Sequence, residues 1–153
     1  MRLFFKILIA LIAIFSLESF LLDPVHVLET PPTTIIKYKS MSSFLHAIGK
    51  RESNNSYTVV SKYGNLGKYQ FKKQTLKSIG IRTDASSFLS NKSLQEKAMI
   101  KLLSVNRQTL EDIIERYDGT YIGDTRITES GILAAAHLVG PDGVLKFFER
   151  RIE

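Results

Sequence analysis

The first helix of the chain is predicted from residues 42–52, which read SSFLHAIGKRE. Phe44, Leu45 and Ile48 recur at helical spacing, and the serines before them can cap the helix. Glu52 follows Ile48 by four residues and Leu45 by seven, so it continues the apolar stripe that should face the core. Burial of a carboxyl group raises its pKa and suits it to donate a proton near neutral pH. Glu52 is therefore a candidate general acid, and a solvated glutamate at a helix end is the simpler alternative.

Helical patterns dominate the sequence beyond residue 52. A β-prone run at 57–60 followed by Gly64-Asn65 predicts a short hairpin after the first helix. Further helices are predicted at 72–79, after a Ser93–Glu96 capping box, and from Thr109, Thr128 and Val144 onward. The helix after Thr128 is apolar around most of its surface, so it should be central. The sequence predicts a mainly α fold (α+β), a compact helical domain with one hairpin after its first helix.

The N-terminal residues indicate export. Arg2 and Lys6 precede an apolar run at residues 7–15, which is too short to cross a bilayer comfortably. Residues 1–22 are therefore expected to be a signal peptide or, if they are not cleaved, an anchor in the inner membrane. Residues 23–40 contain prolines and threonines without periodicity and are expected to be a linker, so the domain should occupy residues 41–153. The expected location is periplasmic or extracellular.

Composition limits the chemistry of the chain. It has 153 residues and no cysteine, which excludes disulfides, thiol nucleophiles and cysteine-ligated metals. The three histidines are spaced unlike any metal site, so we expect no metal and no cofactor. A monomer is the default expectation.

The formal net charge of +6 is unevenly distributed. Between Lys37 and Lys101 the only acids are Glu52, Asp84 and Glu96. A basic lobe on an exported protein suggests an anionic partner such as bacterial cell wall, and lysine-rich solubility is the alternative. Nucleic acid is not expected as a partner, because no nucleic-acid motif accompanies the charge.

Three short motifs occur in order along the chain. They read RESNNSY at residues 51–57, YGNLGKYQF at residues 63–71 and AAAHLVG at residues 134–140. Together they resemble the lysozyme-like lytic transglycosylases, of the soluble lytic transglycosylase and goose-type lysozyme superfamily. In that superfamily a Glu-Ser pair closes the first helix, a Gly-x-x-Gln element follows, and an alanine-rich central helix ends in glycine. The resemblance covers residues 41 to about 148 and implies a lysozyme-like fold.

Several residues around Glu52 are candidates for binding a sugar polymer. Ser53 can hydrogen-bond near the carboxyl group or the sugar, or simply end the helix. Tyr63 and Tyr69 can stack on sugar rings, although aromatic residues in a hairpin more often pack. The Gln70 amide suits N-acetyl groups and hydroxyls, and Gly67 permits a tight turn and close approach of a polymer.

The third motif departs from the family. Many members carry a Tyr-Asn pair in the central helix, where this chain has Ala136-His137. His137 is a candidate polar neighbour of the catalytic glutamate, and a core histidine bonded to backbone is the alternative.

No second carboxylate is convincingly placed, since Asp84, Asp118 and Asp124 lie in loops or turns. The resemblance implies that a single glutamate acts as acid and then base on the bond between N-acetylmuramic acid (MurNAc) and N-acetylglucosamine (GlcNAc), leaving anhydro-muramic ends. The partner would be peptidoglycan glycan strands. The alternatives are a muramidase of the same fold, with Asp84 or Asp124 as assisting base, and a non-catalytic cell-wall-binding module.

Overall fold

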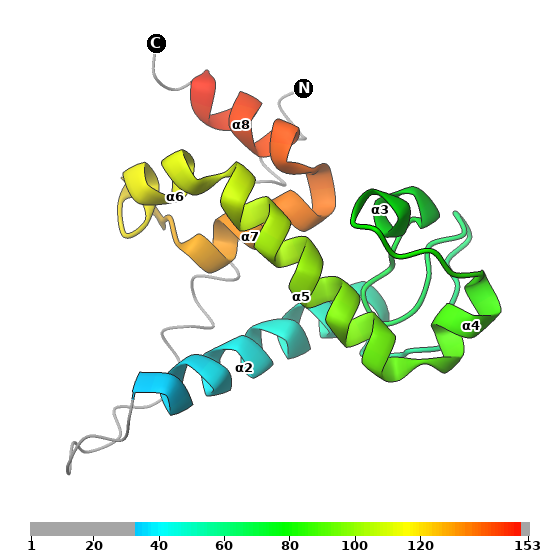
Figure 1. Ribbon diagram of the computed structural model, residues 1–153. Coiled ribbons are helices and arrows are strands. Elements are labelled where there is room, and N and C mark those ends of the chain that lie inside the picture. Colours follow the sequence, from blue (N-terminus) through cyan, green and yellow to red (C-terminus); the bar gives the residue numbers. More distant parts are fainter. Residues whose placement is uncertain (1–32, 151–153) are drawn as a thin grey trace. The chain divides into compact units, whose positions relative to one another are not determined.

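The computed structural model describes residues 33–150, with side chains from residue 41 onward. Within this range the fold is mainly helical, with helices α2 to α8 and one two-stranded antiparallel hairpin (Figure 1). The described residues fall into two compact units, 33–102 and 103–150. The expected signal or anchor at residues 1–22 lies outside the described residues, as does the linker up to residue 32.

Helix α2 spans Thr33–Ser53 and carries the candidate acid in its last turn. It begins well before the predicted serine caps, inside the segment expected to be a linker. Its start directly follows Pro32, the last proline of the N-terminal region, and no proline interrupts the sequence from there to Ser53. Leu45 and Ile48 are buried, which confirms the predicted apolar stripe.

The hairpin predicted directly after this helix is absent. Residues 54–72 form an irregular segment, in which Leu66 makes isolated antiparallel bridges to Val60 and to Phe71. Gly64 and Gly67 both have positive φ angles, of 77° and 67°. These two glycines are only three residues apart, so the chain folds back twice within a short stretch, and each pairing is limited to a single bridge.

Three helices follow in the same part of the chain. Helix α3 spans Lys73–Ser78 and α4 spans Ala85–Ser90, where the Asp84 carboxylate caps the start of α4. Helix α5 spans Lys92–Thr109, and its actual cap is the Asn91 side chain, which accepts a hydrogen bond from the Leu94 amide at 2.9 Å. The predicted Ser93–Glu96 capping box is therefore wrong, because Ser93 already lies inside the helix.

The core of residues 33–102 is built around three aromatic rings. Phe71 makes edge-to-face contacts with Tyr69 and with Phe88, with ring centroids 6.3 Å and 5.9 Å apart. All three residues are buried, together with Leu45 and Ile48 from α2. The irregular segment is therefore fixed by apolar packing as well as by its turns.

The remaining elements lie in residues 103–150. Helix α6 spans Glu111–Tyr117, and strands β1 (Tyr121–Ile122) and β2 (Thr125–Arg126) form the hairpin. Helices α7 (Glu129–Val139) and α8 (Pro141–Glu149) complete the chain. The hairpin of this fold is thus near the C-terminus and not after the first helix.

Helix α7 is the most deeply buried element of this unit. Its residues from Gly131 to Ala136 are all buried, as its sequence predicts, and the Thr128 side chain caps it by accepting from the Gly131 amide at 3.1 Å. No single helix within residues 33–150 is long and apolar enough to cross a membrane. Helices α7 and α8 meet that criterion only as a pair, and they are bent by 117° at their junction.

Candidate functional site

Glu52 lies in the last turn of α2 with its side chain half-buried. Burial raises the pKa of the Glu52 carboxyl above its usual value of 4.5, and the neighbouring Arg51 guanidinium offsets only part of this effect. Among residues 41–150, no side chain or amide donates a hydrogen bond to this carboxyl group. Glu52 therefore has the desolvated environment that the sequence predicts for a proton donor.

The chain turns sharply after Glu52 and Ser53. Asn54 and Asn55 both have left-handed backbones, with φ angles of 56° and 62°. Asparagine tolerates this conformation better than most residues. The amide of Asn55 donates to the Gly49 carbonyl at 2.9 Å, which closes the end of α2.

Ser53 connects this helix end to the Gly67–Gln70 motif. Its hydroxyl donates to the Lys68 carbonyl oxygen at 2.7 Å and accepts from the Ser56 amide at 3.0 Å. Of the two roles considered for Ser53, the observed one is to fasten the helix terminus. This bond also brings the second sequence motif against the first.

Gly67 and Gln70 form a tight turn in the second motif. A Cβ atom at Gly67 would lie 2.1 Å from the Gln95 side-chain oxygen, so the close approach that requires glycine is made by Gln95. Gln70 has a φ of 51°, and its side-chain amide donates to the Gly67 carbonyl at 2.8 Å. The tight turn is confirmed. One of the two N–H groups of the Gln70 side-chain amide is used within this turn, so the other N–H and the amide oxygen are left for a ligand.

The two candidate tyrosines have opposite environments. The Tyr63 side chain is 79% exposed, with the Lys62 ammonium 4.9 Å from its ring centroid. Tyr69 is completely buried, and its hydroxyl donates to Glu96 at 2.6 Å. Tyr69 therefore packs in the core and presents no face to a ligand, whereas the Tyr63 ring is free to stack on one.

Glu96 binds the second motif through Lys68 and Tyr69, and the sequence analysis did not single it out as a binding residue. Its carboxylate accepts hydrogen bonds from the Lys68 ammonium at 2.7 Å, from the Tyr57 hydroxyl at 2.6 Å and from the Tyr69 hydroxyl at 2.6 Å. Burial by itself would raise the pKa of Glu96, but these three donors outweigh it and lower the pKa. Glu96 is therefore a charged acceptor, the opposite of Glu52. Sequence reading assigned Glu96 to a helix cap, and only the long-range partners distinguish the two roles.

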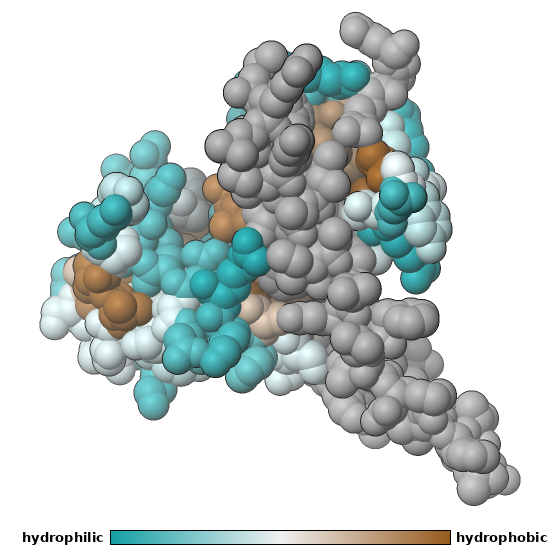
Figure 2. Space-filling view, turned by 180° about the vertical axis from the view of Figure 1, so that it is seen from behind, coloured by the Kyte–Doolittle hydropathy of each residue, from teal (hydrophilic) through white to brown (hydrophobic). Residues whose placement is uncertain are grey.

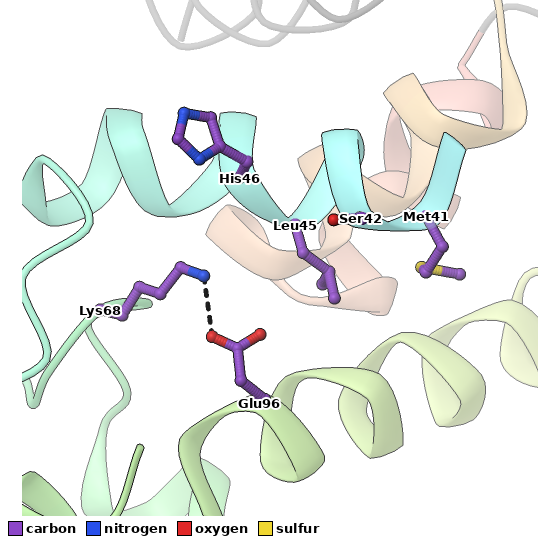
Figure 3. A pocket seen from close by; sticks show the side chains of 6 residues that line it. All are labelled: Met41, Ser42, Leu45, His46, Lys68 and Glu96. Carbon is purple, nitrogen blue, oxygen red and sulfur yellow. Dashed lines mark hydrogen bonds and ion pairs between the residues drawn. The ribbon is translucent and has the colours of Figure 1, made fainter. Parts of the chain in front are cut away.

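An open pocket of about 290 Å³ lies between α2 and the start of α5. Figure 3 shows Leu45 and Met41 pointing from α2 toward α5, and Lys68 reaching Glu96, while the His46 ring points away from that pair. The lining residues are Met41, Ser42, Leu45, His46, Lys68 and Glu96. Glu52 does not line this pocket, since it lies seven residues beyond Leu45, about 10 Å further along the helix.

The other predicted residues have separate environments. His137 is half-buried in the last turn of α7, within residues 103–150. Asp84 is the N-cap of α4, and hydrogen bonds from the Ser87 hydroxyl and amide lower its pKa. Asp124 lies exposed in the turn between β1 and β2. Within residues 33–150 no three histidine, aspartate or glutamate side chains are placed to hold a metal ion.

The surface of residues 41–102 is strongly basic. Every lysine and arginine in this range except Lys68 is exposed, whereas its only acids are Glu52, Asp84 and Glu96. Figure 2 shows a largely hydrophilic described surface on one face of the molecule, broken by small separate hydrophobic groups. An anionic partner would be attracted to this unit.

Comparison with models of protein families finds no match to this chain, and comparisons with curated proteins and with solved structures find none. The resemblance to lytic transglycosylases therefore depends on the three sequence motifs alone.

Proposed function

We propose that this protein is an exported peptidoglycan-cleaving enzyme, a lytic transglycosylase that cuts MurNAc–GlcNAc bonds with Glu52 as its acid and base. The observation that carries the proposal is the environment of Glu52. It is a half-buried carboxyl with a raised pKa at the end of α2, next to the Ser53 hydroxyl that binds the Gly67–Gln70 motif. Cleavage of a glycosidic bond needs a carboxylic acid that keeps its proton until the leaving oxygen takes it.

In the proposed reaction Glu52 first protonates the glycosidic oxygen. The resulting carboxylate then removes the proton from the C6 hydroxyl of MurNAc, whose oxygen attacks C1 and closes the anhydro ring. The N-acetyl group of the substrate stabilises the positive charge of the transition state, and no water is consumed. One protein carboxylate is sufficient for this sequence of steps.

The placement of Asp84 argues against it as the assisting base of a muramidase. A muramidase needs a base to activate water, and the Asp84 carboxylate is already bound by Ser87 as a helix cap. The exposed ring of Tyr63 and the basic surface of residues 41–102 suit contact with an anionic glycan polymer.

The test is digestion of purified peptidoglycan by the full chain, with mass spectrometry of the released fragments. The proposal expects anhydro-muramic ends. It expects Glu52→Gln to lower the rate by about 10²–10⁴-fold, because glutamine cannot donate the proton. Glu115→Gln, at an exposed position on α6, is the matched control and should keep full activity.

Each other outcome points to a different function. Reducing ends would identify a muramidase. Binding of peptidoglycan without release of fragments would identify a wall-binding module. Unchanged cleavage by Glu52→Gln would remove Glu52 from the mechanism.

A further inference from the structure

Lys68, in the irregular segment, contacts two residues of α2 and two residues of α5. Its carbonyl oxygen accepts from Ser53, and its amide donates to the Gln95 side chain at 2.9 Å. Its ammonium donates to Glu96 at 2.7 Å. Its aliphatic stem lies against α2 so closely that a Cβ atom at Gly49 would be 2.6 Å from the Lys68 Cε atom.

This lysine is only 8% exposed, which is unusual for a lysine and costly without a partner. Glu96 supplies the compensating charge. The Glu96 carboxylate also accepts from Tyr57 and Tyr69, at either end of the irregular segment. Three donors from this segment thus converge on one carboxylate of α5.

Gln95, the residue before Glu96, uses its side chain to bind backbone groups of the same irregular segment. Its side-chain amide nitrogen donates to the Tyr57 carbonyl at 2.9 Å and to the Phe88 carbonyl at 3.0 Å, while its oxygen accepts from the Lys68 amide. The side chain is completely buried. Both polar atoms of the Gln95 side chain therefore bond to the irregular segment, and the amide nitrogen also bonds to α4.

We propose that the Lys68–Glu96 ion pair positions Glu52. Glu96 binds the Lys68 ammonium. Lys68 in turn accepts a hydrogen bond from Ser53 and packs its aliphatic stem against Gly49, and these two contacts fix the turn of α2 that carries the Glu52 carboxyl. Glu96 is therefore a positioning residue, and not a second catalytic acid: its carboxylate stays charged and bound to three donors. This inference rests on the proposed function for its effect on rate, and on the geometry alone for its effect on structure.

The first test is structural and needs no substrate. Glu96→Gln in the full chain should increase hydrogen exchange at the amides of residues 54–56 and 67–70 by at least about 10-fold, because the helix end and the turn lose their common anchor. Lys97→Met, at an exposed position on the same helix, is the control and should leave these amides unchanged. Unchanged exchange in Glu96→Gln would overturn the proposal.

The second test measures the reaction. With each variant kept well below its melting temperature, Glu96→Gln and Lys68→Met should lower kcat by about 10–100-fold with KM within about twofold, since a misplaced acid slows the chemical step more than binding. The double variant Lys68→Arg/Glu96→Asp keeps opposite charges at the two positions. Its kcat should be well above that of either single variant. Wild-type kcat in the folded single variants would overturn the positioning role.

The two tests also separate this inference from the proposed function. If the wild-type chain releases no fragments from peptidoglycan but Glu96→Gln still loosens residues 54–56 and 67–70, the proposed function is refuted and the positioning of the Glu52 turn is supported. If the wild type cleaves and both readouts are unaffected by Glu96→Gln, the positioning role is refuted and the proposed function stands.

Discussion

Replacement of Gly67 by alanine tests the contact on which the second motif depends. The new methyl group would lie 2.1 Å from the Gln95 side-chain oxygen and 2.7 Å from its carboxamide carbon, distances at which something must shift. The backbone cannot relieve the clash easily, since Gly67 has a φ of 67° and its amide and carbonyl are both hydrogen-bonded. Gln95 must therefore move, although its side chain is completely buried.

The magnitude follows from two contributions. A left-handed backbone costs an alanine about 1–2 kcal/mol relative to glycine. Displacing Gln95 weakens its bonds to the Lys68 amide and to the Tyr57 and Phe88 carbonyls, and each buried partner left unsatisfied costs about 1–3 kcal/mol. We expect Gly67→Ala to destabilise the protein by at least about 4 kcal/mol, which combines the lower limits of these contributions.

Gly64→Ala is the matched control for this substitution. Gly64 has a φ of 77°, close to that of Gly67, but no atom lies within 4 Å of its Cβ position. Its cost should be limited to the backbone contribution of about 1–2 kcal/mol. Urea denaturation of both variants, followed by circular dichroism, gives the comparison. Equal losses for the two variants would refute the close approach of Gln95 to Gly67.

Three further predictions concern the helix ends. Glu52→Gln should be more stable than the wild type at pH 7, because a raised folded-state pKa means that wild-type stability falls as pH rises from 4.5 through that pKa. Calorimetry from pH 4 to pH 7 should show the variant's advantage growing with pH, and an advantage that shrinks would contradict a desolvated carboxyl. Ser53→Ala should cost about 1–2 kcal/mol in urea denaturation, because the Lys68 carbonyl loses its 2.7 Å donor, and a neutral effect would show that this bond contributes nothing. Thr128→Ala should cost about 1 kcal/mol and Thr128→Ser much less, since serine keeps the cap of α7; equal losses would exclude the cap as the cause.

The helices were predictable where one local signal sufficed. Helix α7 combines a Thr128 cap with residues that are apolar around most of its surface, and both features are found. The helix predicted at 72–79 is found as α3, and Gly80 just beyond it has a φ of 76°, which suits the end of a helix. The start of α2 at Thr33 was missed because threonine-rich residues after two prolines resemble a linker, although no proline follows to break a helix.

The hairpin was placed wrongly although its signal was present. Gly123 and Asp124 form a two-residue turn between Ile122 and Thr125, which pair with each other. Such a Gly-Asp turn between β-prone residues is a stronger hairpin signal than the run at 57–60. Val59 and Val60 are exposed, and the pairing of this run is limited to the isolated bridge between Val60 and Leu66.

The candidate site was predictable only in its first residue. Glu52 could be found because its burial follows from spacing along one helix. The partners of Glu96 lie 27 to 39 residues away in the sequence, so no spacing rule brings them together. Glu96 reaches Lys68 instead of the helix start because Asn91 already caps α5 and a buried ammonium requires a negative charge.

The most direct test of a desolvated acid at Glu52 is its own titration. Selective ¹³C labelling of glutamate side chains, with Glu52→Gln to assign the resonance, would follow this carboxyl by NMR as pH is raised. The account predicts a midpoint clearly above 4.5, the usual value for glutamate. A midpoint at or below that value would mean that water reaches the carboxyl freely, and Glu52 would then lack the property on which its proposed role depends.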